Sequence, residues 1–147
     1  MKKAEILALM DDAEAVYLAT IAGKGPRIRA LVNLRRRDLY PGPSEIARTQ
    51  DGTVYLTTSR DSDKIREIRA NPAVAVYYCI PGSFHGVMVG GTAQTSSDPA
   101  LKQALWSEDW RLYWPQGYSD PDYVVVRIVP EEIRGWWNSA PFMLEVP

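Results

Sequence analysis

A hydroxyl-rich turn followed by a lysine is the part of this sequence best suited to bind an anion. The segment from Gly52 to Pro72 reads as a strand over 53–58, a short turn, and a helix near 62–70. Backbone N–H groups at the start of a helix are unpaired and carry partial positive charge, so such a junction can hold a phosphate. The candidate ligands are the hydroxyls of Thr57, Thr58, Ser59 and Ser62 and the ammonium group of Lys64.

The same residue types also serve a purely structural purpose. A serine or aspartate just before a helix, here Ser62 or Asp61, commonly caps the first N–H groups of that helix. The carboxylates of Asp61 and Asp63 would also repel an anion. From this segment alone, an anion site and a capped helix both remain open.

Basic residues gather in the first half of the chain. The net charge of the 147 residues is −1, so there is no overall attraction to nucleic acid. Residues 1–72 hold 13 Lys and Arg against 10 Asp and Glu, whereas residues 73–147 hold 4 against 8. Between Ala15 and Arg37 there are six cations and no acid. This distribution suits a small anionic ligand better than a long polyanion, with a solvated arginine face as the alternative.

The composition predicts one domain, residues 1–147, of an ordinary water-soluble protein. The hydrophobic fraction is 46% and the charged fraction 24%, and no apolar run is long enough to span a bilayer. The first residues, MKKAEILALMDDAEA, read as an amphipathic helix rather than a signal peptide. A single cysteine, Cys79, excludes an internal disulfide framework and favours a cytoplasmic location.

Short strands joined by hairpin-length turns dominate the predicted secondary structure. We expect strands over 15–21, 27–34, 53–58, 73–80, 87–95, 122–129 and 133–138. The second of these alternates, with Arg27 and Arg29 on one face and Ile28 and Ala30 on the other. Helices are expected over 2–13, over 62–70 and from Asp98-Pro99 onward, and a long loop over 35–52 with a helical turn around Ser44 to Arg48. Gly90-Gly91 predicts a bulge. The pattern favours a mainly β (α+β) antiparallel barrel with helices at its ends.

Other chemical motifs find little support. Zinc needs three or four ligands, and one Cys and one His do not supply them, so no metal site is expected. Cys79 and His85 face each other across a hairpin loop, but Cys79 lies in an apolar strand and reads as a buried small residue. No glycine-rich dinucleotide motif or Walker sequence occurs. No catalytic acid or base can be named.

Aromatic residues gather in the second half of the chain. Trp106, Trp110, Tyr113 and Trp114 lie within nine positions of one another, and Trp136-Trp137 follow near the end. Such residues serve cores and subunit interfaces far more often than ligands, so packing is the favoured interpretation. The functional alternative is a flat apolar wall for a ring system, with Trp106 as a candidate.

Four segments together resemble one known family. They are VYLATIAGKGPRIRALV (16–32), VYLTTSRDSDKIREIRANPAVAVYY (54–78), VGGTAQTSSDPALKQALW (89–106) and DPDYVVVRIVPEEIRGWW (120–137). The second is the most specific, because it resembles the signature T-x-x-x-S-x-K-x-x-x-x-x-x-N-P. The chain is similar to the pyridoxamine 5′-phosphate oxidase-like, FMN-binding split-barrel superfamily, and within it to the short branch that resembles general stress protein 26.

This resemblance implies a fold, a cofactor and an assembly. The fold would be a six-stranded antiparallel Greek-key split β-barrel with two to three flanking helices. The protein would be a homodimer with FMN at the subunit interface and a small-molecule substrate, without nucleic acid or membrane partners. By position, the flavin phosphate would be bound by an arginine of the second strand and by the junction described above: Arg29 and Arg27, with Thr57, Thr58, Ser62 and Lys64.

Two departures from the family pattern bear on function. Asp63 stands where the family often has an arginine, which removes one cation from the phosphate site. The chain ends RGWWNSAPFMLEVP, without the Arg-x-His element of true pyridoxamine phosphate oxidases, so that reaction is disfavoured. We therefore expect an FMN-dependent oxidoreductase of unknown substrate. The alternatives are a non-catalytic flavin-binding or redox-sensing stress protein, a binder of F420 or heme, and a scaffold with an empty pocket.

Overall fold

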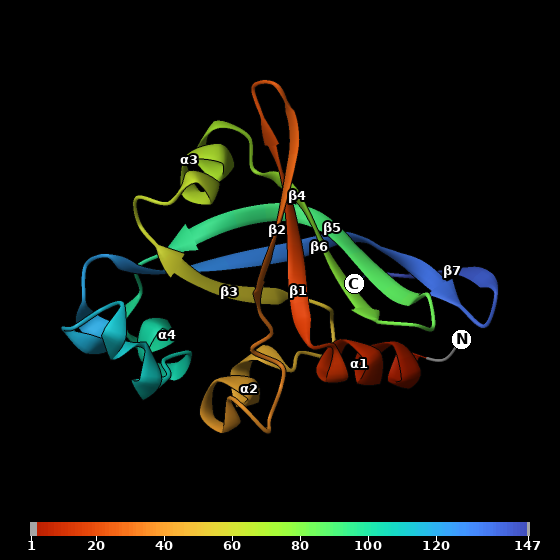
Figure 1. Cartoon of the computed structure of the whole chain (residues 1–147), viewed down its shortest axis with the longest axis horizontal. Helices are drawn as coiled ribbons and strands as arrows, with labels where there is room; N and C mark the ends of the chain where they lie inside the picture. Colours follow the sequence, from red (N-terminus) through yellow and green to blue (C-terminus); the bar gives the residue numbers. More distant parts are fainter. Residues whose placement is uncertain (1–2, 147) are drawn as a thin grey trace.

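One curled antiparallel sheet forms the body of the molecule, a half-barrel flanked by helices (Figure 1). The computed structural model describes residues 3–146. The sheet order is β2-β1-β4-β5-β6-β3, and β7 pairs with β6. The strands are β1 (Ala15–Ala22), β2 (Gly25–Val32), β3 (Val54–Ser59), β4 (Ala73–Ile80), β5 (His85–Ser96), β6 (Tyr123–Trp137) and β7 (Ala140–Leu144). The predicted fold, a six-stranded antiparallel half-barrel with added helices, is confirmed, and β7 extends it.

Short helices cover the ends of the sheet. They are α1 (Lys3–Asp12), α2 (Pro41–Ala47), α3 (Asp63–Ala70) and α4 (Pro99–Ala104), with two 3-10 turns, Glu108–Leu112 and Gly117–Ser119. The predicted helix at Asp98-Pro99 is confirmed, and the Asp98 carboxylate caps it by accepting from the Leu101 backbone N–H at 3.1 Å. Among the described residues, no helix is both long and apolar enough to cross a membrane.

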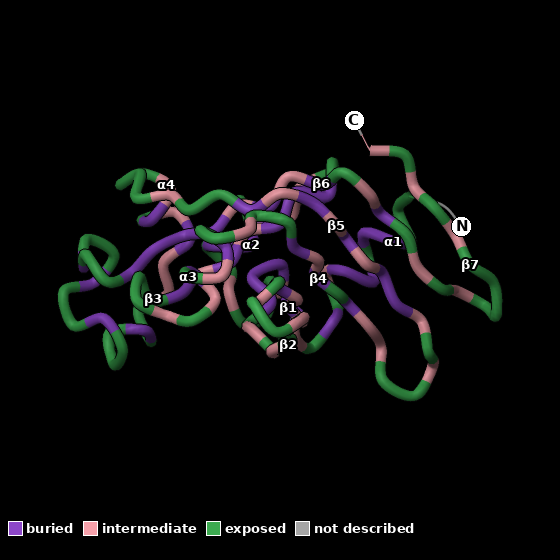
Figure 2. Tube along the Cα trace, turned by 90° about the horizontal axis from the view of Figure 1, so that it is seen from above, coloured by how far each residue is buried: buried purple, intermediate pink, exposed green. Residues whose placement is uncertain are grey.

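The first hairpin carries two different faces. β1 and β2 pair directly, with Leu18 opposite Arg29 and Thr20 opposite Arg27. Because side chains alternate along a strand, Arg27 and Arg29 share the face of the buried Leu18 and Thr20, as the sequence predicts. The other face carries Ile28, which is 70% exposed (Figure 2 shows the hairpin end-on). The arginines therefore point to the inner side of the half-barrel.

A hydrophobic core fills the hollow of the sheet. Ile6 and Met10 of α1 and Ile65 and Ile68 of α3 pack with alternate residues of the strands. The apolar spacing that predicts α1 and α3 therefore marks the sides that these helices bury. α3 is fixed in this way at the end of β3, and the turn between them has a defined position.

Three details differ from the sequence prediction. The strands predicted over 122–129 and 133–138 are one strand, β6, which runs through Pro130. The register of β6 against β5 shifts at Gly90-Gly91, so the predicted bulge is confirmed and accommodates the proline. The second difference is β7, which was not predicted because the segment after Trp137 begins with polar residues. The third is α2, which begins at Pro41 rather than near Ser44.

Candidate functional site

The first turn of α3 lacks a side-chain cap. Ser62 occupies the position before the helix, but its side chain makes no capping hydrogen bond. Its hydroxyl instead accepts from the Thr58 hydroxyl, Oγ1 to Oγ, at 3.3 Å. The helix therefore keeps its positive N-terminal end without a side-chain cap, beside two hydroxyl groups.

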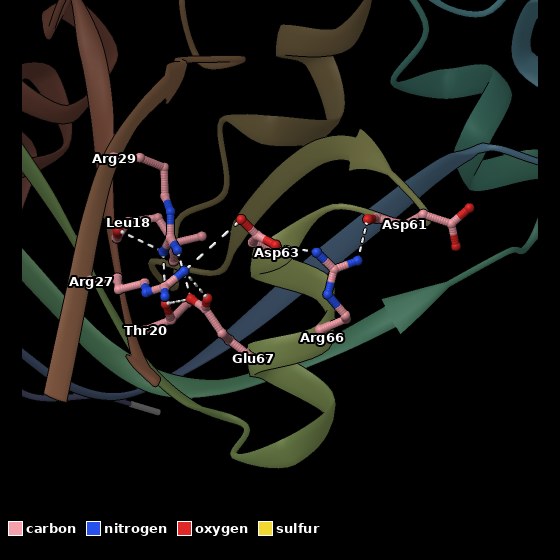
Figure 3. A network of polar contacts seen from close by, with 8 residues as sticks. All are labelled: Leu18, Thr20, Arg27, Arg29, Asp61, Asp63, Arg66 and Glu67. Atoms are coloured by element: carbon pink, nitrogen blue, oxygen red, sulfur yellow. Dashed lines mark hydrogen bonds and ion pairs between the residues drawn. The ribbon is translucent and has the colours of Figure 1, made fainter. Parts of the chain in front are cut away.

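Arg29 is held in place by three partners from β1 and α3 (Figure 3). Its Nη1 donates to Thr20 Oγ1 at 2.8 Å and to the Leu18 carbonyl at 3.3 Å, and its Nη2 donates to Glu67 Oε1 at 2.7 Å. The side chain is 23% exposed. Because a guanidinium has five N–H donors, two of them remain for a ligand within the described part of the chain.

Glu67 joins the two arginines of β2. Its Oε2 accepts from Arg27 Nη1 at 3.2 Å, while its Oε1 accepts from the Thr20 hydroxyl at 2.6 Å as well as from Arg29. The hydrogen bond from Thr20 and the neighbouring Arg29 hold the pKa of Glu67 below its usual range. This carboxylate therefore stays ionised at neutral pH and offsets part of the positive charge of the site.

Asp63 is the second carboxylate near these arginines. It lies 3.9 Å from Arg27 and also pairs with Arg66 one turn further along α3 (Figure 3). Both Asp63 and Arg66 are exposed, so water screens their charges. Asp63 therefore opposes an anion less strongly than Glu67 does.

Lys64 forms no ion pair among the described residues, although the charges of Asp63 and Glu67 act on it from a longer distance. Residues 3–146 contain no ion pair to Lys64 (the ion pairs of this region all belong to arginines). Partial burial and, secondarily, the nearby Arg29 guanidinium lower the pKa of Lys64 from its ordinary value of 10.5. An anion bound near Lys64 and Arg29 would offset the repulsion that Arg29 exerts on the Lys64 ammonium group.

Two members of this network, Thr20 and Glu67, were not among the residues predicted from the sequence. Thr20 is an ordinary strand residue and Glu67 an ordinary helix residue, each with no motif of its own. One signal was available: Glu67 follows Lys64 by three positions, so the two side chains share one face of α3. The pairing of Thr20 with Arg27 across β1 and β2 required the hairpin register.

An open cavity of about 650 Å³ lies beside Thr57 on β3. It reaches from β2 to the aromatic turn, residues 106–114, and its lining includes Val32, Trp110, Tyr113 and Trp114. β2 and β3 are the two ends of the sheet path, so the cavity lies where the half-barrel is split. A cavity of this size is within the range of cofactor and ligand sites.

The aromatic cluster is mainly a packed unit. Trp106 stands edge-on to Trp110 and Tyr123, at centroid distances of 5.9 and 5.0 Å. Its indole N–H donates to Glu108, and it does not line the 650 Å³ cavity. Trp114 does line the cavity, and its buried indole N–H has no hydrogen-bond partner within the described residues. Trp110 and Trp114 therefore line the cavity, whereas Trp106, the tryptophan suggested by the sequence, packs against them and does not reach it.

Two arginines of the 35–52 segment, Arg35 and Arg48, serve the fold rather than the site. Arg35 is buried and bonds Asp11 and the carbonyls of Ala47 and Thr49. Arg48 bonds the same Asp11 at 2.7 Å. Of the six cations between Ala15 and Arg37, Arg35 therefore fastens this segment to α1, and Arg36 pairs with Asp38.

His85 and Cys79 occupy structural positions on the second hairpin. The His85 ring stacks on Trp137 at a centroid distance of 4.0 Å, and its Nε2 accepts from the Asn138 backbone N–H. Cys79 pairs with Gly86 in the ladder of β4 and β5 and is half-buried rather than fully buried as predicted, because it lies near the end of β4. Within residues 3–146, no group of three or more Cys, His, Asp or Glu could hold a metal ion.

Known proteins share this architecture along most of the chain. General stress protein 26 of Bacillus subtilis is 29% identical over 136 residues, which cover 90% of this chain and 86% of the relative. A Clostridium acetobutylicum structure described as related to general stress protein 26, of the pyridoxinephosphate oxidase family, has a TM-score of 0.77 at 20% identity and covers 99% of this chain and 96% of its own. General stress protein 26 of Bacillus anthracis has a TM-score of 0.74 at 23% identity and covers 97% and 98%.

The family model described as "Pyridoxamine 5′-phosphate oxidase like" matches residues 41–146. This range contains α3, Lys64 and the aromatic turn, and the matching structures repeat the half-barrel around them. The chain therefore belongs to the pyridoxamine 5′-phosphate oxidase-like family.

Proposed function

We propose that this protein binds FMN and acts as a flavin-dependent oxidoreductase on a small molecule other than pyridoxamine phosphate. The family typically binds FMN and often catalyses flavin-dependent oxidation or reduction. One observation in this chain supports the cofactor: the N-terminus of α3 has no side-chain cap and carries Lys64 without an ion pair among the described residues. A phosphate monoester supplies the charge that such a site lacks.

The residues present fit a flavin phosphate, although the Glu67 carboxylate offsets part of their positive charge. Lys64 and the remaining N–H donors of Arg29 would bind the phosphate, and the hydroxyls of Thr58 and Ser62 would complete its hydrogen bonds. Arg27 would contribute mainly long-range attraction, because Glu67 already pairs with it. The bound flavin would supply the electron transfer, and the protein would supply binding, orientation and shielding from water.

The cavity beside Thr57 offers the space for the flavin ring. Thr57 lines that cavity and its neighbour Thr58 bonds Ser62. Because successive strand residues point to opposite faces, a flavin that uses both sites would pass across the end of β3 from one face of the sheet to the other. Apolar and aromatic walls suit a planar ring. Trp110 and Trp114 are better placed than Trp106 to contact it.

We further propose a homodimer that encloses the flavin between subunits. The outer face of β1 and β2 carries three exposed apolar side chains, Ile21, Ile28 and Val32. Val32 also lines the cavity, so this apolar face is continuous with the proposed flavin site. Exposed apolar patches of this kind commonly mark interfaces.

A visible absorption spectrum of the purified protein tests the cofactor. Flavin bands near ~450 nm are expected, whereas a Soret band near ~400 nm would indicate heme and replace the proposal. Steady-state oxidation of reduced pyridine nucleotides by the flavin-loaded protein then tests catalysis. Flavin binding without turnover of any reductant would assign the protein to the non-catalytic, redox-sensing alternative.

A further inference from the structure

A second cationic cavity lies where β3 and β5 end, separate from the proposed flavin site. Its volume is about 250 Å³. Three cationic side chains and two hydroxyl groups line it: Arg60, Arg69, Lys102, Thr95 and Ser97. No carboxylate is among the lining residues. This combination of charge and hydrogen-bond donors is suited to an oxyanion.

The sheet topology brings these residues together from distant parts of the sequence. β6 lies between β3 and β5, pairing Tyr123 with Ser59 on one side and Val126 with Thr95 on the other. The ends of β3 and β5 therefore lie near each other, with α3 and α4 on either side (Figure 1). Arg60 follows β3 directly, and its backbone N–H donates to the Asp122 carbonyl at 2.8 Å.

Lys102 is the residue that most needs a ligand. Lys102 is only 7% exposed, and its Nζ donates to the Asp120 backbone carbonyl at 3.0 Å. It also lies 5.5 Å from the centre of the Tyr123 ring. Both partners are neutral, and Lys102 has no ion pair in the described chain. A buried ammonium group is costly unless an opposite charge compensates it.

The neighbouring carboxylates do not fill this role. The Asp120 carboxylate accepts from the backbone N–H groups of Gln116 and Asp122. Asp122 pairs with Arg60 at 3.1 Å, but both side chains are about half exposed, so this pair is weak and screened. Arg69 has no ion-pair partner within residues 3–146. The cavity thus keeps a net positive charge.

We propose that this cavity binds a small phosphate-bearing molecule, either inorganic phosphate or a short phosphorylated metabolite. Lys102 would contribute the buried charge, Arg60 and Arg69 the donors at the mouth, and Thr95 and Ser97 the hydroxyl contacts. A volume of about 250 Å³ is below the usual range for cofactor sites, so FMN is excluded by size. The proposal does not depend on flavin binding.

Titration with phosphate, followed by amide resonances in ¹⁵N-labelled full-length protein, tests the site. The Lys64→Ala variant is used beside the wild type, so that the start of α3 cannot account for binding. We expect inorganic phosphate to shift the amides of Thr95, Ser97 and Lys102 in both proteins. Glycerol 3-phosphate, titrated in parallel, distinguishes a phosphorylated metabolite (tighter binding) from free phosphate (equal or weaker binding).

Two surface variants identify the ligands without risk to the core. Arg60→Gln and Arg69→Gln should each weaken phosphate binding about three- to tenfold, the loss expected for a partly exposed charged hydrogen bond. Arg134→Gln, an exposed arginine of β6 outside the cavity, should leave binding unchanged. Absence of shifts at Thr95, Ser97 and Lys102, or equal weakening in all three variants, would overturn the proposal.

Discussion

Glu67 of α3 binds Arg29 of β2, with 2.7 Å between Oε1 and Nη2. The contact connects the element that begins at the proposed phosphate site with the edge strand that carries its arginine. It has two opposite effects on an anion: it orients the guanidinium, and it neutralises part of the guanidinium's charge. Substitutions at Glu67 and Lys64 separate these two effects.

Replacing Glu67 with glutamine should strengthen FMN binding. The amide oxygen can still accept from Arg29 and Thr20, so the orientation is kept while the negative charge is lost. We expect the Kd for FMN to fall about three- to tenfold at low salt. Fluorescence quenching of FMN measures it, with Glu132→Gln, which also loses a carboxylate paired with an arginine, as the matched control. Weaker binding by Glu67→Gln would show that the charge of Glu67 supports the site.

Replacing Lys64 with alanine should weaken FMN binding by about 1.5–3 kcal/mol, the range for hydrogen bonds to charged groups. Of Arg27, Arg29 and Lys64, only Lys64 forms no ion pair in the described chain, so its ammonium group is free to bind the phosphate directly. Lys24→Ala, in the exposed turn between β1 and β2, removes the same charge away from α3. Equal affinities of wild type and Lys64→Ala would remove Lys64 from the site.

As the pH is raised, the FMN affinity should begin to fall at a lower pH than it would if Lys64 had the pKa of an ordinary lysine. The pKa of free Lys64 lies below 10.5, first because of burial and then because of Arg29. A bound phosphate favours the protonated amine. The affinity for FMN should therefore be highest below the lowered pKa of Lys64 and decline as the pH rises through that pKa. Titrations over about pH 7 to 10 test this. Lys64→Arg, which stays charged, should lack the decline, and an identical decline in both proteins would contradict the assignment.

Removing the Thr20 hydroxyl should destabilise the fold. Thr20 is 1% exposed, and its hydroxyl bridges Glu67 and Arg29. Thr20→Val leaves these charged groups without that bridge, at an expected cost of about 1–3 kcal/mol in the free energy of unfolding. Urea denaturation measures it. Thr92→Val, which removes an exposed hydroxyl bonded to Glu131, should cost about 0.5 kcal/mol or less.

A charge on the outer face of β2 should separate the proposed dimer. Ile28→Glu places a carboxylate at a position that is 70% exposed in one subunit, so the monomer should fold normally. Light scattering should give twice the 16.5 kDa chain mass for the wild type and one chain mass for the variant. Phe84→Glu, at an 85% exposed position in the β4–β5 turn, is the control. A monomeric wild type would refute the dimer.

The sequence predicted the elements whose patterns are local. The apolar spacing of α1 and α3, the alternation along β2 and the Gly90-Gly91 bulge all have signals within a few residues, and the structure confirms them. The continuous β6 was missed because Pro130 commonly ends a strand, and only its pairing with the bulged β5 shows how the proline is accommodated.

The sequence suggested the cations of the proposed site but not the carboxylates beside them. Arg27, Arg29 and Lys64 were selected by charge, motif and resemblance, and the structure brings them to one corner of the half-barrel. Glu67 comes into contact with both arginines only through the packing of α3 against β1. Such a contact between residues about 40 positions apart depends on the whole fold.

A crystal structure of the protein with FMN bound tests the central claim most directly. We predict the flavin phosphate at the start of α3, within hydrogen-bond distance of Lys64, Thr58 and Ser62, with the ring in the cavity beside Thr57. The account would be contradicted by crystals grown in excess FMN that show no flavin at this junction, with Glu67 and Asp63 still paired with Arg27 and Arg29 as in the free protein.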